Sequence, residues 1–173
     1  MDYESKYCKN CGEGLYSNSD KLKACIGVEG CYWIDFENPI PTAVTLVPIR
    51  GGILTIRRGI EPAKGRLGLP GGFIEKREQP YDGAKREVLE ETGAIIEIER
   101  LIYEKNPNPQ ILNNIVHGYV GRYLGGELRA GDDAEEVVIL PVKSLEELCF
   151  TSHQEIVRLW RDNDENFGLP IKL

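Results

Sequence analysis

A short helical segment with three clustered carboxylates constrains the fold more than any other feature of this sequence. Pro80 suits the first position of a helix, and Gly93 suits the position after its last residue. Glu87, Glu90 and Glu91 lie at i, i+3 and i+4, so a helix places their carboxylates on one face. These like charges repel one another, and they lie where the helix dipole disfavours anions.

Ion pairs within the helix relieve only part of this repulsion. Arg86 can reach Asp82 and Glu90, which lie four positions away on either side. Glu87 and Glu91 have no basic residue three or four positions away inside the helix. One interpretation is a solvated acidic face, and the other is a site for a hard divalent cation such as Mg²⁺. We favour the cation, because such local conflicts concentrate at functional sites.

The loop before this helix is rich in glycine. It reads Leu69-Pro70-Gly71-Gly72, and glycine lets a backbone approach a ligand closely because it has no Cβ. Alone, this sequence indicates a tight turn. Placed before an acidic helix, it predicts a cradle for phosphate and metal, with Gly71 and Gly72 near the substrate.

The spacing of these residues matches the Nudix box, G-x5-E-x7-R-E-U-x-E-E-x-G-U, where U is a bulky apolar residue. The fixed positions are occupied by Gly72, Glu78, residues 86–91 and Gly93, and only Ala94 is smaller than usual. The chain therefore resembles the Nudix hydrolases. The resemblance implies an α+β fold, an α/β/α sandwich with a mixed β-sheet.

The resemblance also implies a metal site and a reaction. The implied ligands of Mg²⁺ or Mn²⁺ are Glu87, Glu90, Glu91 and the Gly72 carbonyl. Arg86 and Glu78 would orient these carboxylates, because ligands need partners that hold them. The implied reaction is attack of water on a phosphorus of a pyrophosphate, with a carboxylate accepting the proton.

Family members differ in the carboxylate that acts as the base. The candidates here are Glu91 and the pair Glu135-Glu136, which follows Gly131-Asp132-Asp133. We prefer Glu136 as a further ligand or base. The alternative is that the pair lies exposed at the start of a strand.

Four of the five cysteines lie within the first 31 residues: Cys8, Cys11, Cys25 and Cys31. This segment resembles the zinc ribbon that precedes the Nudix domain in NADH pyrophosphatase-like and ADP-ribose/FAD pyrophosphatase-like proteins. Four thiolates suit a closed structural Zn²⁺ site. The second pair is spaced Cys-x5-Cys instead of the usual Cys-x2-Cys, which makes Cys25 the weakest candidate ligand. Free thiols or a disulfide are the alternatives.

The resemblance divides the chain into a zinc ribbon, residues 1–37, and a hydrolase domain, residues 38–173. The formal charge of −7 argues against a broad nucleic-acid or membrane-binding face. The first 38 residues alone carry seven acids and four bases, a poor match to phosphate. No apolar run approaches the ~20 residues that span a bilayer, and no signal peptide is evident, so a cytoplasmic protein is expected.

Hydrophobic patterns predict a mixture of strands and helices without strict alternation. The expected strands are Thr42 to Ile49, Ile53 to Arg57, Ile95 to Tyr103, Ile115 to Tyr123 and Glu136 to Leu140. The expected helices are Pro80 to Thr92, Ser144 to Leu148 and Ser152 to Arg161, the last two from capping-box patterns. Residues 65–72 are expected to form a loop.

Several residues bear on the substrate. Arg57 and Arg58 end a strand, and strand alternation lets only one of them face the site and bind phosphate oxygens. Three aromatic side chains could stack on an adenine or belong to the core: Phe73, Tyr103 and Phe150. Pro109 follows the box by 15 residues, as in many relatives that prefer ADP-ribose, although a plain loop proline is an equal interpretation.

The sequence therefore predicts hydrolysis of ADP-ribose or a related dinucleotide such as FAD. One alternative is an NADH pyrophosphatase or NAD-cap hydrolase, although the Ser-Gln-Pro-Trp sequence of such relatives is missing after the box. Another is a non-catalytic nucleotide sensor, which the intact box carboxylates disfavour. The partner expected in each case is a small nucleotide, and a homodimer is one expected assembly.

Overall fold

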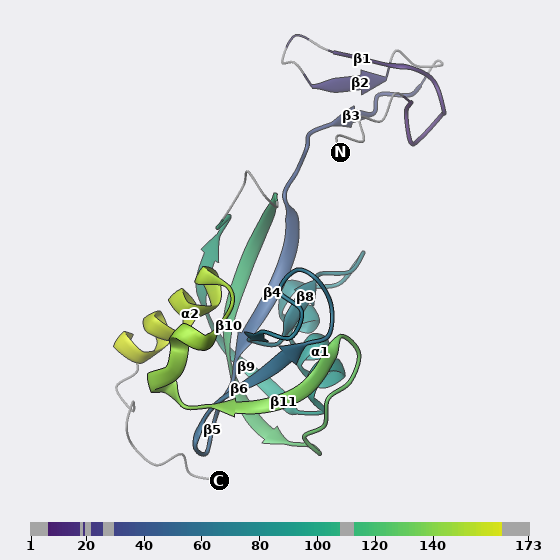
Figure 1. Cartoon of the computed structure of the whole chain (residues 1–173). Helices are drawn as coiled ribbons and strands as arrows, with labels where there is room; N and C mark the ends of the chain where they lie inside the picture. Colours follow the sequence, from purple (N-terminus) through teal and green to yellow (C-terminus); the bar gives the residue numbers. More distant parts are fainter. Residues whose placement is uncertain (1–6, 18, 20–21, 26–29, 108–112, 164–173) are drawn as a thin grey trace. The chain divides into compact units, whose positions relative to one another are not determined.

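The structure is a computed structural model that describes residues 7–17, 19, 22–25, 30–107 and 113–163. The chain forms two compact units, Met1–Pro39 and Ile40–Leu173 (Figure 1). The division falls two residues after the boundary expected from the sequence. It follows Pro39, one of two prolines that interrupt the chain here.

The first unit contains a three-stranded antiparallel sheet in the order β1-β2-β3. Its strands are β1 (Leu15–Ser17), β2 (Lys23–Cys25) and β3 (Ile34–Asp35). Strands this short bury little surface. Among the described residues of this unit, the buried apolar side chains are Cys8, Ala24 and Cys31. Cysteines thus occupy the place where a hydrophobic core would otherwise lie.

The second unit contains two sheets. The first has the order β8-β4-β10-β9 and is mixed, because β10 runs parallel to β4 while the other pairs are antiparallel. Its strands are β4 (Ile40–Leu46), β8 (Gly71–Phe73), β9 (Ile95–Lys105) and β10 (Asn114–Gly125).

The second sheet is antiparallel and has the order β11-β6-β5, with β7 also paired to β6. Its strands are β5 (Pro48–Ile49), β6 (Gly52–Arg58), β7 (Leu67–Gly68) and β11 (Ala134–Leu140). The helices are α1 (Pro80–Thr92), the 3₁₀ helix η1 (Val142–Glu147) and α2 (Thr151–Asn163).

Helices α1 and α2 lie on opposite sides of the strands (Figure 1). On one side, Val88 of α1 packs with Leu54 in one apolar cluster. On the other side, Ile156 of α2 packs with Leu46 and Ile53. This arrangement confirms the predicted α+β class and the α/β/α sandwich with a mixed sheet.

Three local predictions differ from the structure. The predicted strand from Thr42 to Ile49 is split, because Pro48 has no N–H for the ladder and the chain passes to the second sheet there. The predicted loop over residues 65–72 contains β7 and β8, which form only because β6 and β4 supply partners. Ser144 lies inside η1 and makes no capping hydrogen bond, since Pro141 already begins that turn.

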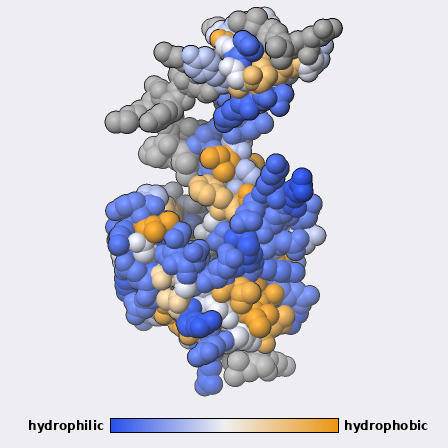
Figure 2. Space-filling model, turned by 90° about the vertical axis from the view of Figure 1, so that its right-hand side faces the viewer, coloured by the Kyte–Doolittle hydropathy of each residue, from blue (hydrophilic) through white to orange (hydrophobic). Residues whose placement is uncertain are grey.

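Figure 2 shows a mainly hydrophilic face on which apolar residues gather in limited patches, as a formal charge of −7 suggests. None of the helices in the described ranges is both long and apolar enough to cross a membrane.

Candidate functional site

The glycine turn before α1 lies directly against the glutamates of that helix. A Cβ at Gly72 would lie 2.5 Å from Glu87 Oε1, and a Cβ at Gly71 would lie 2.3 Å from the carbonyl oxygen of Ala43. The backbone N–H of Gly71 donates to Glu91 Oε2 at 2.8 Å. Glycine at both positions therefore allows β8 to fit between β4 and the acidic face of α1.

Arg86 joins three carboxylates through its guanidinium group. Its Nε and NH2 atoms donate to the two oxygens of Glu78 at 2.9 and 3.0 Å. Its NH1 atom donates to Glu87 at 2.8 Å and to Glu90 at 2.9 Å. These hydrogen bonds lower the pKa of Glu78 and raise that of Arg86 above its already high value. Glu78, rather than the expected Asp82, pairs with Arg86 because the preceding loop folds back onto the helix.

Two of the three glutamates on the acidic face of α1 are buried. The exposed fraction is 3% for Glu91 and 9% for Glu87. Burial raises the pKa of Glu91 to about 8, against the hydrogen bond from Gly71. Burial also raises the pKa of Glu87, although Arg86 opposes the shift. A cation beside these carboxylates would offset the cost of burying their charge, so the site is suited to binding one.

The oxygen donors fit a hard cation, since Mg²⁺ and Mn²⁺ prefer carboxylate and carbonyl oxygens. Glu87, Glu90 and Glu91 share one face of α1, while their carboxylates have separate partners in Arg86 and Gly71. Within the described ranges, these glutamates do not form a group whose ligand atoms all lie within 4.8 Å of one another.

Arg57 and Arg58 point to opposite faces of β6, as strand alternation requires. The guanidinium carbon of Arg58 lies 5.2 Å from the ring centroid of Phe150. Its positive charge also acts on Glu91 and opposes the rise of that pKa. Arg57 instead donates through Nε to Glu136 Oε2 at 2.9 Å. Arg58 is therefore the arginine on the side of the box carboxylates.

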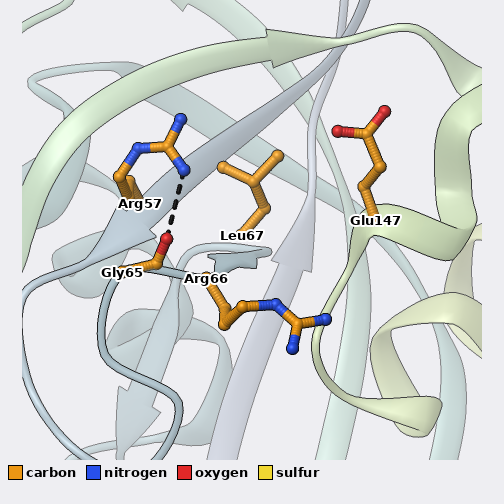
Figure 3. Close-up of a pocket in the computed structure, with 5 residues that line it drawn as sticks. All are labelled: Arg57, Gly65, Arg66, Leu67 and Glu147. Atoms are coloured by element: carbon orange, nitrogen blue, oxygen red, sulfur yellow. Dashed lines mark hydrogen bonds between the residues drawn. The ribbon is translucent and has the colours of Figure 1, made fainter.

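A small open pocket of about 260 Å³ lies on the Arg57 side. Figure 3 shows Arg57 and Glu147 on either side of Leu67, with Arg66 below them and Arg57 bonded to the carbonyl oxygen of Gly65. The pocket thus presents two guanidinium groups and an opposing carboxylate. This mixed charge distinguishes it from the acidic face of α1.

The predicted base candidates after β10 have basic partners of their own. Glu136 pairs with Arg57, and 56% of its side chain is exposed. Glu135 Oε1 lies 3.7 Å from Lys64 Nζ. The register of β11 against β6 shifts between Ala134 and Glu136, so these two glutamates lie at a bulge.

Sequence reasoning missed the segment that precedes β11. The N–H of Gly131 donates to the carbonyl oxygen of Glu91 at 3.2 Å, and the N–H of Arg129 donates to that of Thr92 at 3.0 Å. These contacts fasten the segment to the last turn of α1, whose carbonyl groups lack partners within the helix. The sequence singled out Gly131-Asp132-Asp133 only as the stretch before Glu135-Glu136. In the structure, a Cβ at Gly131 would lie 2.5 Å from the carbonyl oxygen of Glu90.

This segment brings two further carboxylates toward the box. The negative charge of Asp133 raises the pKa of Glu91, and that of Asp132 raises the pKa of Glu87. The N–H of Gly59 holds the carbonyl oxygen of Asp133 at 2.6 Å, which anchors the segment to the end of β6. The acidic field at the site is therefore larger than the box alone supplies.

The candidate aromatic residues have different surroundings. Tyr103 belongs to the core, whereas Phe73 is 53% exposed. Phe150 is half-buried and lies edge-on to His153, with ring centroids 4.9 Å apart. Nδ1 of His153 accepts a hydrogen bond from the N–H of Leu69 at 3.0 Å, and burial lowers the pKa of His153 to about 3.

The four N-terminal cysteines form a compact group in the first unit. None of the four is in a disulfide, and their sulfur atoms lie within 4.8 Å of one another. Cys8 and Cys31 are 3.8 Å apart, and Cys11 and Cys25 are 3.4 Å apart. A tetrahedral zinc site with Zn–S bonds of about 2.3 Å places its sulfurs roughly 3.8 Å apart, so the group fits Zn²⁺. A hydrogen bond from Asn10 lowers the pKa of Cys31 to about 6, which favours the thiolate form.

A family model described as the NUDIX domain matches residues 39–165. An ADP-ribose pyrophosphatase from Methanocaldococcus jannaschii is 35% identical over 111 residues, which cover 61% of this chain and 63% of that protein. The match therefore spans less than two thirds of the relative's length.

The solved structures that resemble the chain include two Nudix proteins. A NUDIX hydrolase from Nitrosomonas europaea has a TM-score of 0.78 and 22% identity, covering 98% of this chain and 97% of that one. A MutT/nudix family protein from Enterococcus faecalis has a TM-score of 0.55 and 29% identity, covering 60% of this chain and 44% of that one. The coverage of the first structure extends the similarity in fold over both units.

Proposed function

The chain belongs to the Nudix family, and we propose that it hydrolyses the pyrophosphate of a nucleoside diphosphate linked to a second group. ADP-ribose is the first candidate substrate, and a related dinucleotide such as FAD is the second. One observation carries the proposal: the buried carboxylates of Glu87 and Glu91 lie against the backbone of Gly71 and Gly72. That arrangement suits a cation and a diphosphate held side by side.

We assign the divalent metal to Glu87, Glu90, Glu91 and the carbonyl group of Gly72. When bound, Mg²⁺ or Mn²⁺ would polarise the phosphoryl oxygens and lower the pKa of the attacking water. Arg86 orients Glu87 and Glu90 through NH1, and Glu78 fixes the guanidinium through two hydrogen bonds. Both act as positioning residues of the site.

Arg58 is the stronger candidate for binding phosphate oxygens. Its charge acts on Glu91, and a guanidinium group can donate to an oxyanion through its two terminal nitrogens. Its Nε already donates to the carbonyl oxygen of Pro62 at 2.8 Å. Arg57 is the second candidate, although Glu136 and the carbonyl oxygen of Gly65 already engage it. Phe150, beside Arg58, is available to contact a nucleobase.

Glu91 and Glu136 are the proposed acceptors of the water proton. As water attacks one phosphorus, this carboxylate takes its proton, and the P–O bond to the other phosphate breaks to give two monophosphates. Asp133 is a third candidate, because the segment fastened to α1 brings its charge close to Glu91. Glu136→Gln and Asp133→Asn would separate these assignments through the acidic limb of the pH–rate profile.

The substrate assignment rests on the relative from M. jannaschii, which is an ADP-ribose pyrophosphatase. Pro109, the sequence feature that favoured the same substrate, lies outside the described residues. ADP-ribose is therefore the first compound to test.

The proposal is tested by incubating the full chain and Mg²⁺ with ADP-ribose, FAD, NADH, NAD-capped RNA and nucleoside triphosphates. The products measured are AMP from ADP-ribose, FAD and NADH, nicotinamide mononucleotide from NAD-capped RNA, and the nucleoside monophosphate from each triphosphate. Release of AMP from ADP-ribose or FAD is expected, with Glu91→Gln as the inactive control. Turnover of NADH or capped RNA alone would favour the alternative pyrophosphatase. Tight binding without turnover would favour a sensor, and turnover of triphosphates alone would refute the proposed substrate class.

The proposal for the first unit is a structural Zn²⁺ ion held by Cys8, Cys11, Cys25 and Cys31. Reduced thiolates at such a site suit a cytoplasmic protein. A homodimer is the proposed assembly, as in related enzymes, and sedimentation analysis would test it.

A further inference from the structure

Asn10 contacts the two most deeply buried sulfur atoms of the cysteine group. Its backbone N–H donates to Cys8 Sγ at 3.4 Å, and its side-chain Nδ2 donates to Cys31 Sγ at 3.5 Å. The first contact is local, but the second joins residues 21 positions apart. Asn10 thus bridges the first pair of cysteines and the second pair.

The contact between Asn10 and Cys31 matters because Cys25 and Cys31 are widely spaced in the sequence. Cys8 and Cys11 are separated by two residues, whereas Cys25 and Cys31 are separated by five. A longer connection leaves more freedom in the position of the second sulfur. A donor from the first pair therefore restrains Cys31 from outside its own loop.

The charge of a zinc–thiolate centre supplies a second reason. Four thiolates around Zn²⁺ carry a net charge of −2, and a buried charge needs hydrogen-bond donors. Cys8 is 3% exposed and Cys31 is 8% exposed, so water has little access to either sulfur. The amide of Asn10 supplies a donor where solvent does not.

We propose that Asn10 is a positioning residue of the zinc centre, whose side-chain amide donates to the Cys31 thiolate and holds the enlarged second pair against the first. This inference rests on the zinc site proposed for the first unit. It is independent of the hydrolytic reaction, because its readouts measure the metal in the ribbon alone.

The test compares zinc release from the full, zinc-loaded chain to an excess of a chromogenic chelator. Asn10→Ala removes the side-chain donor and keeps the backbone N–H that bonds Cys8. We expect zinc to leave about tenfold faster, in the range typical for loss of a residue that orients a ligand. Asn38→Ala, the same substitution at an exposed position of the same unit, is expected to match the unchanged chain.

Two further variants separate hydrogen bonding from simple packing. Asn10→Asp adds a negative charge and removes the amide donor, so it should release zinc faster than Asn10→Ala. Asn10→Gln keeps an amide donor and should recover part of the lost retention. In Co²⁺-loaded protein, the sulfur-to-metal charge-transfer band of Asn10→Ala should shift, because a lost N–H···S bond raises the electron density on sulfur.

Each outcome has one meaning. Release rates within twofold of the unchanged chain, together with an unshifted charge-transfer band, would refute the role of Asn10. An unchanged chain that binds no zinc when loaded would refute this inference together with the zinc assignment. The hydrolase proposal is judged separately by AMP release, so failure of either proposal is distinguishable from failure of the other.

Discussion

The two units of this chain differ in how much apolar surface they bury. The first has strands of two or three residues, and its buried apolar positions include Cys8 and Cys31. The second has strands of up to 12 residues and buries apolar side chains on both sides of its sheets. Hydrophobic burial therefore supports the second unit, whereas the first buries too little apolar surface for this and would depend on the proposed zinc ion.

The two proposed metal sites differ in a corresponding way. The ligand atoms of the four cysteines lie within 4.8 Å of one another, and cysteines supply most of the buried apolar side chains described in that unit. Packing on the hydrophobic core holds α1 in place, and Arg86 and Gly71 hold its glutamates through hydrogen bonds. We infer that the metal maintains the fold in the first unit, whereas the fold maintains the metal site in the second.

The largest expected effect is unfolding of the first unit when one of its four proposed zinc ligands is replaced. Cys31→Ser should abolish zinc binding and unfold that unit alone, since structural zinc contributes about 10 kcal/mol or more to such folds. Zinc content and amide hydrogen exchange would measure it. Cys149→Ser is the matched control, and it should leave both properties unchanged. Retained protection of residues 22–25 in Cys31→Ser would contradict the comparison.

Shortening a core side chain of the second unit should destabilise that unit and leave the zinc content of the first unit unchanged. Ile156 is fully buried in α2, so Ile156→Ala should destabilise the second unit by about 2–5 kcal/mol through lost burial and a new cavity. Zinc content should not change. Denaturant unfolding followed by far-UV circular dichroism measures the effect. Leu89→Ala, at a leucine that is 51% exposed, should cost far less.

Removing Arg86 should weaken the catalytic metal site without unfolding the core. Arg86→Gln loses the bonds to Glu78, Glu87 and Glu90, so we expect the Mg²⁺ concentration for half-maximal activity to rise about 10–100-fold. Titration of AMP release with Mg²⁺ provides the measurement. Arg122→Gln, at an exposed arginine, is the control and should keep the original requirement. An unchanged requirement in Arg86→Gln would mean that the glutamates need no such support.

The most gradual expected effect concerns the acid stability of the second unit. The folded pKa of His153 is about 3, below its ordinary value of 6.5, so the unfolded chain binds the extra proton between these values. This stabilisation is complete above pH 6.5 and is lost as the pH falls, at up to about 1.4 kcal/mol per pH unit. His153→Gln should flatten the slope between pH 6 and pH 4. Urea midpoints at several pH values would measure it, and identical slopes would exclude a neutral buried His153.

Much of the fold followed from local patterns. The predicted bounds of α1 match the structure, since Pro80 and Gly93 act through the geometry of their own backbone. The strands β9, β10 and β11 lie where alternation placed them, within a few residues. The box glutamates share one helical face for the same local reason.

The sequence could not specify contacts that depend on distant partners. Strands β7 and β8 exist because β6 and β4 lie beside them, and Pro48 turns the chain from one sheet into the other. The approach of Asp133 to Glu91 and the choice of Arg58 over Arg57 depend on the same packing.

The sequence by itself determined which functional groups the chain carries and how they are arranged locally. These are one helical face of carboxylates, a glycine turn before it, and four thiols near the N-terminus. Tertiary structure alone decided which of these groups are buried, which basic residue each carboxylate meets, and that Asn10 reaches Cys31. Helical spacing and glycine geometry act over a few residues of chain, whereas burial and long-range hydrogen bonds exist only after separate segments come together.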